Sequence, residues 1–173
     1  MRRLTVLVSI DGLAAEHDVR RAPATYDRIL KNIAGQHITV HCTITGQMMK
    51  RSGYLEEFLA FWTPRVEVQR VWFSIFTPQK EDLLPEILSA DERGRVVSEL
   101  LVLRQRYLKL DMRAGMIERF AAPPSSPEKC VFAQTTHTVS ADLRTVIKPC
   151  QRVPGGWGTG SHPPQLRSRT IVT

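Results

Sequence analysis

Three short segments of the chain alternate apolar and polar residues as β-strands do, and all three are rich in β-branched residues. They are LTVLVSI at residues 4–10, ITVHCTIT at residues 38–45 and VQRVWFSIF at residues 68–76. Stretches with helical spacing lie between them, near residues 25–34 and from Ser52 onward. The strand starts at 4, 38 and 68 are 34 and 30 residues apart, which is the length of a βα unit. The sequence therefore predicts an α/β fold with a parallel sheet.

A longer helix is predicted after the third strand. Ser89 and Glu92 have the spacing of a capping box, in which each side chain binds a backbone N–H of the helix start. The residues expected on the buried stripe of this helix are Val96, Leu100, Leu103 and Tyr107.

Composition changes twice toward the C-terminus. A polar, proline-rich loop begins near residue 122, and a Gly- and Pro-rich segment without periodicity begins near residue 152. The sequence therefore predicts three regions: βα units over 1–121, a small β-hairpin region over 122–151 and a disordered tail over 152–173. Three βα units are too few for a complete βα barrel, which needs about 250 residues. We expect a partial parallel βα barrel, the second part of a larger one.

The two faces of each predicted strand differ in polarity. In the second strand Val40 and Cys42 share an apolar face, whereas His41 and Thr43 share a polar one. Parallel strands covered on both faces are normally apolar throughout, so we expect the polar face to line a cavity for a polar ligand. A sheet face open to solvent would give the same alternation, and this alternative stays open. The polar residues expected at the carboxyl ends of the strands are Ser9, Asp11, Thr43, Thr45, Ser74 and Thr77.

Composition and charge exclude several classes of protein. The chain has 173 residues, of which 42% are hydrophobic and 24% charged, as in a globular domain. No apolar run approaches the roughly 20 residues of a membrane span, so a membrane partner is not expected. The start, Met1-Arg2-Arg3, does not resemble a secretory signal, and we expect a cytoplasmic protein. Of the net charge of +7, three positive charges lie in residues 151–173, and the +4 that remains over residues 1–150 is mild. Nucleic-acid binding is not expected from it.

The three cysteines, Cys42, Cys130 and Cys150, are an odd number and do not indicate a disulfide framework. Core thiols and metal ligands both remain open as interpretations. Cys42 falls on the apolar face of its strand, which favours a small buried core residue. No nucleophile–base set, zinc-protease motif or phosphate-binding loop occurs in the sequence.

One motif resembles a known family. Val8-Ser-Ile-Asp-Gly12, followed by His17-Asp18 and by Arg21, is similar to the fourth strand of radical S-adenosylmethionine (radical SAM) enzymes. The two βα units that follow match the fifth and sixth strands of the partial barrel of that family. The resemblance covers residues 4 to about 110. It implies a fold of the partial βα-barrel type and an enzyme family that cleaves S-adenosylmethionine reductively and abstracts a hydrogen from its substrate.

The resemblance also implies residues that bind the cofactor. Ser9 and Arg21 become candidates for the carboxylate and ribose of S-adenosylmethionine, together with Asp11 and, with less support, Thr43. A strand-end turn closed by Asp11-Gly12 is the alternative for Ser9 and Asp11. A solvated loop cation is the alternative for Arg21.

A second resemblance concerns iron. Cys130 and the Lys-Pro-Cys150 segment are similar to the auxiliary-cluster region (SPASM or twitch type) that follows the barrel in many of these enzymes. It implies Cys130 and Cys150 as ligands of a four-iron, four-sulfur (4Fe–4S) cluster, with plain thiols as the alternative. The Cys-x3-Cys-x2-Cys loop of the family is absent. The chain therefore resembles a C-terminal fragment that is inactive alone and has the missing N-terminal half of the barrel as a partner.

A different class of function stays open. The arginines of the C-terminal segment, Arg152, Arg167 and Arg169, are accompanied by no acidic residue. A non-enzymatic interaction module would use this basic tail to bind a protein or RNA partner. Whether this chain is an enzyme, and on what substrate, is not decided by the sequence.

Overall fold

The computed structural model describes residues 6–23, 25–76, 85–122, 137–139, 146–147 and 169–171. The chain divides into two compact units, Met1–Thr77 with Leu83–Ala122 and Pro78–Asp82 with Pro123–Thr173. Each unit is described by itself. The predicted cluster ligands Cys130 and Cys150 lie outside the described residues.

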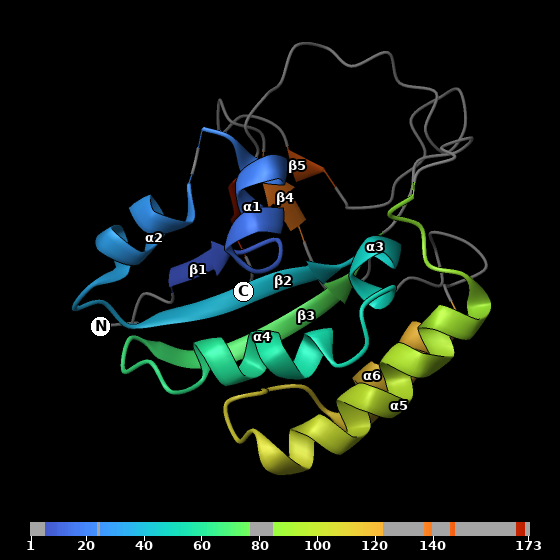
Figure 1. Ribbon diagram of the computed structural model, residues 1–173. Coiled ribbons are helices and arrows are strands. Elements are labelled where there is room, and N and C mark those ends of the chain that lie inside the picture. The colour runs from blue at the N-terminus through green and yellow to red at the C-terminus, as the bar shows by residue number, and fades with distance from the viewer. Residues whose placement is uncertain are drawn as a thin grey trace. The chain divides into compact units, whose positions relative to one another are not determined.

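The first unit alternates strands and helices along the chain (Figure 1). Its elements are β1 (Val6–Ser9), α1 (Ala14–Arg21), α2 (Tyr26–Ile33), β2 (Ile38–Ile44), α3 (Gly46–Met49), α4 (Tyr54–Trp62), β3 (Val68–Ile75), α5 (Ala90–Arg106), α6 (Ala114–Glu118) and the 3-10 helix η1 (Arg119–Ala121).

The three strands of this unit form a parallel sheet in the order β1-β2-β3, which confirms the predicted parallel α/β arrangement. Val8 pairs with Val40, and Val40 pairs with Val71. The register shifts once, between Ile38 and Thr39, because Gln69 forms a bulge in β3. Figure 1 shows α1 at the carboxyl end of β1 and α3 at the carboxyl end of β2.

The apolar face of the sheet carries the core, as predicted. The β2 residues Ile38, Val40, Cys42 and Ile44 are at most 2% exposed. An aromatic cluster centred on Trp62 of α4 packs beside them. The rings of Tyr26, Phe58 and Phe61 lie 5.5, 6.3 and 5.3 Å from the ring of Trp62. This cluster joins α2 to α4, and Phe58 continues it to Phe73 of β3 at 5.6 Å.

Helix α5 begins at the predicted capping box. The Ser89 hydroxyl accepts the Glu92 N–H at 3.2 Å, and the Glu92 carboxylate accepts the Ser89 N–H at 2.8 Å. Val96, Leu100 and Leu103 are buried as expected. The helix ends at Arg106, so Tyr107 caps the helix and does not extend its stripe.

The two outer edges of the sheet differ. Next to β3, Val71 donates its N–H to the carbonyl of Lys109 at 2.7 Å and accepts the N–H of Asp111 at 3.1 Å. This extended segment adds a single parallel bridge at Leu110. Within the described residues, β1 has no neighbour on its other side.

Helices α1, α3, α6 and η1 of this unit were not predicted. Helix α1 is mostly polar, and His17 is its buried residue, so it has no apolar stripe that would have indicated it. Arg21 was expected in a loop, but it is the last residue of α1. Helix α3 begins at Thr45, whose hydroxyl accepts the Met48 N–H at 3.4 Å; Thr45 therefore caps a helix at the end of the strand.

The described strands of the second unit form a separate antiparallel sheet in the order β5-β4-β6, with β4 (His137–Val139), β5 (Val146–Ile147) and β6 (Arg169–Ile171). Strand β6 belongs to the segment predicted as a disordered tail, and the rest of that segment lies outside the described residues. Among the described residues, no helix has both the length and the apolar character that crossing a membrane requires.

Candidate functional site

Polar side chains from neighbouring strands meet on the face of the sheet opposite the core. The Nε2 atom of His41 lies 3.0 Å from the hydroxyl of Ser74, and the Thr43 hydroxyl lies 3.3 Å from the same atom. These contacts follow from the register, because Thr43 pairs with Ser74 and side chains of paired residues point to the same face. The ring of Trp72, which pairs with His41, packs edge-on against the imidazole at 5.8 Å.

The loop after β1 borders this polar face. Asp11 is 5% exposed, and its backbone N–H donates to Nδ1 of the buried His17 at 3.0 Å. Gly12 follows with a φ of 109°, a conformation that residues with a side chain rarely adopt. The next N–H, of Leu13, donates to the hydroxyl of Tyr54 at 2.8 Å. The strand end is thus held by α1 on one side and by α4 on the other.

An ion pair places a guanidinium next to the polar face. The Nε atom of Arg21 donates to Oδ2 of Asp11 at 2.6 Å, and Nε of Arg20 lies 3.8 Å from the same oxygen. Arg20 is held on its other side by Glu86 at 3.2 Å. The side chain of Arg21 is 44% exposed, whereas that of Asp11 is 7% exposed. The buried Asp11 therefore holds Arg21 through its Nε atom, while the Arg21 side chain stays partly exposed.

The His-Asp-x-x-Arg motif has a structural explanation in this chain. His17 accepts the N–H of Asp11, and Asp18 accepts the N–H of Tyr26 at 2.6 Å. Arg21 binds the Asp11 carboxylate. His17 and Arg21 therefore join α1 to the loop after β1, and Asp18 joins α1 to the start of α2.

The four predicted cofactor-binding residues lie around this face. Ser9 pairs with His41 in the sheet, and Thr43 lies two residues further along β2. Asp11 and Arg21 form the ion pair at the end of β1. The hydroxyl of Ser9 has no hydrogen-bond partner within the part of the chain that the structure describes. Ser9 and Thr43 are half-buried and the Arg21 side chain is partly exposed, whereas Asp11 is covered.

Burial controls the charge of His41. The pKa of His41 is lowered from its ordinary value, chiefly because burial disfavours the charged imidazolium, with the nearby Arg21 acting in the same direction and Asp11 opposing it. At neutral pH this histidine is an uncharged donor and acceptor of hydrogen bonds.

We expect the free energy of unfolding to fall as the pH drops below about 6.5, where the unfolded chain protonates His41 before the folded chain does. The unfolded state then binds more protons, so stability rises with pH across this window and this contribution is absent above it. Urea unfolding between pH 5 and 8 measures it. The variant His41→Gln should flatten the dependence. The exposed His37→Gln should leave it unchanged, and equal slopes for both variants would contradict the assignment.

Cys42 does not belong to the polar face. It is 1% exposed on the core side, where burial raises the pKa of its thiol. Across the residues that the structure describes, no group of three or more His, Cys, Asp or Glu side chains could hold a metal ion.

Sequence reasoning missed Tyr54 and Glu86. Tyr54 was not distinguished from other residues at the start of its helix, although its hydroxyl holds the loop after Gly12. Glu86 supports Arg20 from a segment 66 residues further along the chain. No local pattern marks either contact, since both depend on the packing of separate βα units.

The fold and the site define an α/β protein whose parallel sheet has one core face and one polar, partly buried face. Comparisons with protein-family models, with curated proteins and with solved structures found no match.

Proposed function

We propose that the polar face at the carboxyl ends of β1, β2 and β3 binds S-adenosylmethionine, and that this chain forms part of a partial βα barrel of the radical SAM type. The observation that carries the proposal is the guanidinium of Arg21, which the buried Asp11 binds at the carboxyl end of β1. In the next strand of the sheet, His41 and Thr43 contact the Ser74 hydroxyl. In α/β folds of parallel strands, ligands bind at this end of the sheet.

The chemistry of the residues suits the ligand. Arg21 uses its Nε atom for Asp11, so its terminal nitrogens are the donors that a ligand carboxylate would meet. Asp11 acts as a positioning residue, because it orients the guanidinium without reaching the surface. The hydroxyls of Ser9 and Thr43 are partners for the ribose.

The described residues do not fit an iron–sulfur cluster. Such a cluster requires several cysteine thiolates, and the one cysteine in the described part of the chain is the buried Cys42. Cys130 and Cys150 lie outside the described residues. We therefore propose cofactor binding by this chain and derive no step that involves a cluster.

Isothermal titration calorimetry of the purified chain tests the proposal with two ligands. S-adenosylmethionine should bind at least about tenfold more tightly than methylthioadenosine, which lacks the carboxylate and the amine. The variant Arg21→Ala should lower the affinity for S-adenosylmethionine by about tenfold and leave that for methylthioadenosine unchanged. Arg21→Lys keeps the charge but loses the planar fork, so we expect an intermediate loss.

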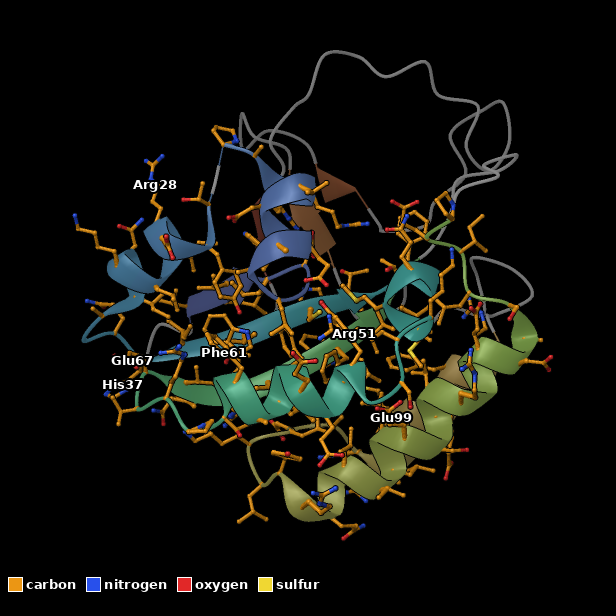
Figure 2. The ribbon with its side chains drawn as sticks, in the orientation of Figure 1. Arg28, His37, Arg51, Phe61, Glu67 and Glu99 are labelled. Atoms are coloured by element: carbon orange, nitrogen blue, oxygen red, sulfur yellow. The ribbon has the colours of Figure 1, made fainter. Side chains whose placement is uncertain are left out.

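A matched control is Arg28→Ala on α2, which removes the same charge. Arg28 is exposed, and Figure 2 shows it pointing away from the sheet. Its affinities should equal those of the parent chain. The proposal is wrong if the parent chain binds neither ligand, or if the two arginine variants change the affinity for S-adenosylmethionine equally.

A further inference from the structure

The register of the sheet brings a nucleophile and a base together. Nε2 of His41 lies 3.0 Å from Oγ of Ser74, a distance over which a base can take a proton from a hydroxyl. The two residues are 33 positions apart in the chain, so no sequence motif marks the pair. Both residues are half-buried, so the pair is neither a fully exposed contact nor sealed in the core.

A second hydroxyl continues this contact. Oγ1 of Thr43 lies 3.3 Å from Oγ of Ser74. When the imidazole hydrogen of His41 is on Nδ1, Ser74 donates its hydrogen to Nε2 and Thr43 donates its hydrogen to Ser74. In this tautomer Nε2 is the atom that accepts a proton, and Ser74 is the group that loses it.

The surroundings of the pair suit an uncharged reactant. The pKa of His41 is lowered from its ordinary value, chiefly because of burial, so the imidazole is a free base at neutral pH. The ring of Trp72 lies 5.8 Å from the imidazole and supplies an apolar surface beside the pair. Within the described residues, the hydrogen bonds of Ser74 join it to His41 and Thr43, neither of which carries a charge.

We propose that Ser74 is a nucleophile that His41 activates, and that it accepts the acyl group of an uncharged carboxylic ester. His41 removes the hydroxyl proton while Oγ of Ser74 bonds to the carbonyl carbon. The bond from that carbon to the ester oxygen then breaks, and the proton passes from His41 to the leaving alcohol. Water next attacks the acyl-serine; His41 takes a proton from the water and returns it to Oγ of Ser74 as the carboxylic acid departs.

The pair lacks the third member of a catalytic triad. Nδ1 of His41 has no hydrogen-bond partner in the part of the chain that the structure describes. In serine hydrolases an acid binds this atom and fixes the tautomer, and disabling it lowers kcat about 10⁴-fold. We therefore expect slow chemistry in which an activated ester leaves the acyl group on Ser74, and not rapid turnover.

Mass spectrometry of the full chain incubated with p-nitrophenyl acetate, without S-adenosylmethionine, tests the proposal. Ser98, which is exposed on α5, serves as the internal reference. We expect an acetyl group on Ser74 at a rate at least about a hundredfold above that at Ser98. Ser74→Ala should remove this adduct, and His41→Gln should slow its formation about a hundredfold.

His37→Gln is the matched control, because His37 is exposed and its hydrogen-bond partner is Gln69. Ser74 should be acylated in this variant as in the parent chain, and circular dichroism should show all variants folded. Nitrogen-15 NMR of the parent chain should find the imidazole hydrogen of His41 on Nδ1.

Three outcomes would overturn the inference. They are acylation of Ser74 no faster than that of Ser98, equal rates for the two histidine variants, and an imidazole hydrogen of His41 on Nε2. The comparison with Ser98 and the tautomer are both measured in the parent chain, so they need no variant to fold. S-adenosylmethionine is absent from every measurement, so failure of the proposed cofactor binding leaves this inference intact.

Discussion

Replacing Gly12 with alanine is expected to lower the free energy of unfolding by about 3 kcal/mol. Two effects add. The φ of 109° disfavours any residue with a side chain, and a Cβ at this position would lie 2.7 Å from the hydroxyl of Tyr54 and 3.0 Å from Cβ of Glu16. Tyr54 has little freedom to move, because it is 2% exposed and its hydroxyl accepts the Leu13 N–H. Denaturant unfolding of the purified variant measures the loss.

Two other glycines separate the contributions. Gly35 has a φ of 72° but open space where a Cβ would be, so Gly35→Ala should lose only the conformational part, about 1 kcal/mol. Gly94 lies within α5 and has open space, so Gly94→Ala should gain up to about 1 kcal/mol. If Gly12→Ala loses no more than Gly35→Ala, the close approach of α4 to this loop is not present in solution.

Replacing Trp62 with alanine is expected to remove about 3–5 kcal/mol of stability. Trp62 is fully buried and contacts aromatic rings from two helices, so its removal leaves a cavity at the centre of the core. A domain of this kind has a total stability of about 5–15 kcal/mol, so we expect the variant to retain only part of it. Thermal and denaturant unfolding followed by circular dichroism measure the change.

A milder pair of variants keeps this prediction testable if the alanine variant does not fold. Trp62→Phe retains most of the packing and should lose about 1–2 kcal/mol. Phe61→Ala alters the neighbouring residue, which is half-buried and stacks on Arg65 at 4.3 Å, and should lose less than Trp62→Ala. A larger loss at Phe61 than at Trp62 would place the centre of the aromatic cluster elsewhere.

Some of the residues that hold the polar face in place also contact the aromatic core. Gly12 and Tyr54 hold the loop that carries Asp11, and Asp11 holds Arg21. Tyr26 receives support from Asp18 and packs against Trp62. A destabilising change in the aromatic cluster is therefore expected to loosen the polar face as well.

Local pattern determined the parts of the fold that depend on neighbours in the sequence. The alternation in residues 38–45 predicted which residues of β2 face the core, because side chains of a strand alternate regardless of its partners. The spacing of Ser89 and Glu92 predicted the start of α5, since both capping bonds form within one turn. The spacing of the strands predicted the parallel sheet, which needs a crossover connection of this length.

Packing between distant segments decided the rest. The contact between His41 and Ser74 joins residues 33 positions apart, and the bulge at Gln69 sets the register that brings them together. Helix α1 has no apolar stripe; it is positioned by His17 and Arg21, which bind the loop before it. A segment after α5 pairs with Val71 at one edge of the sheet, and no pattern in the sequence indicated this contact. A sequence pattern records the preferences of each segment, whereas these contacts depend on which segments fold against each other.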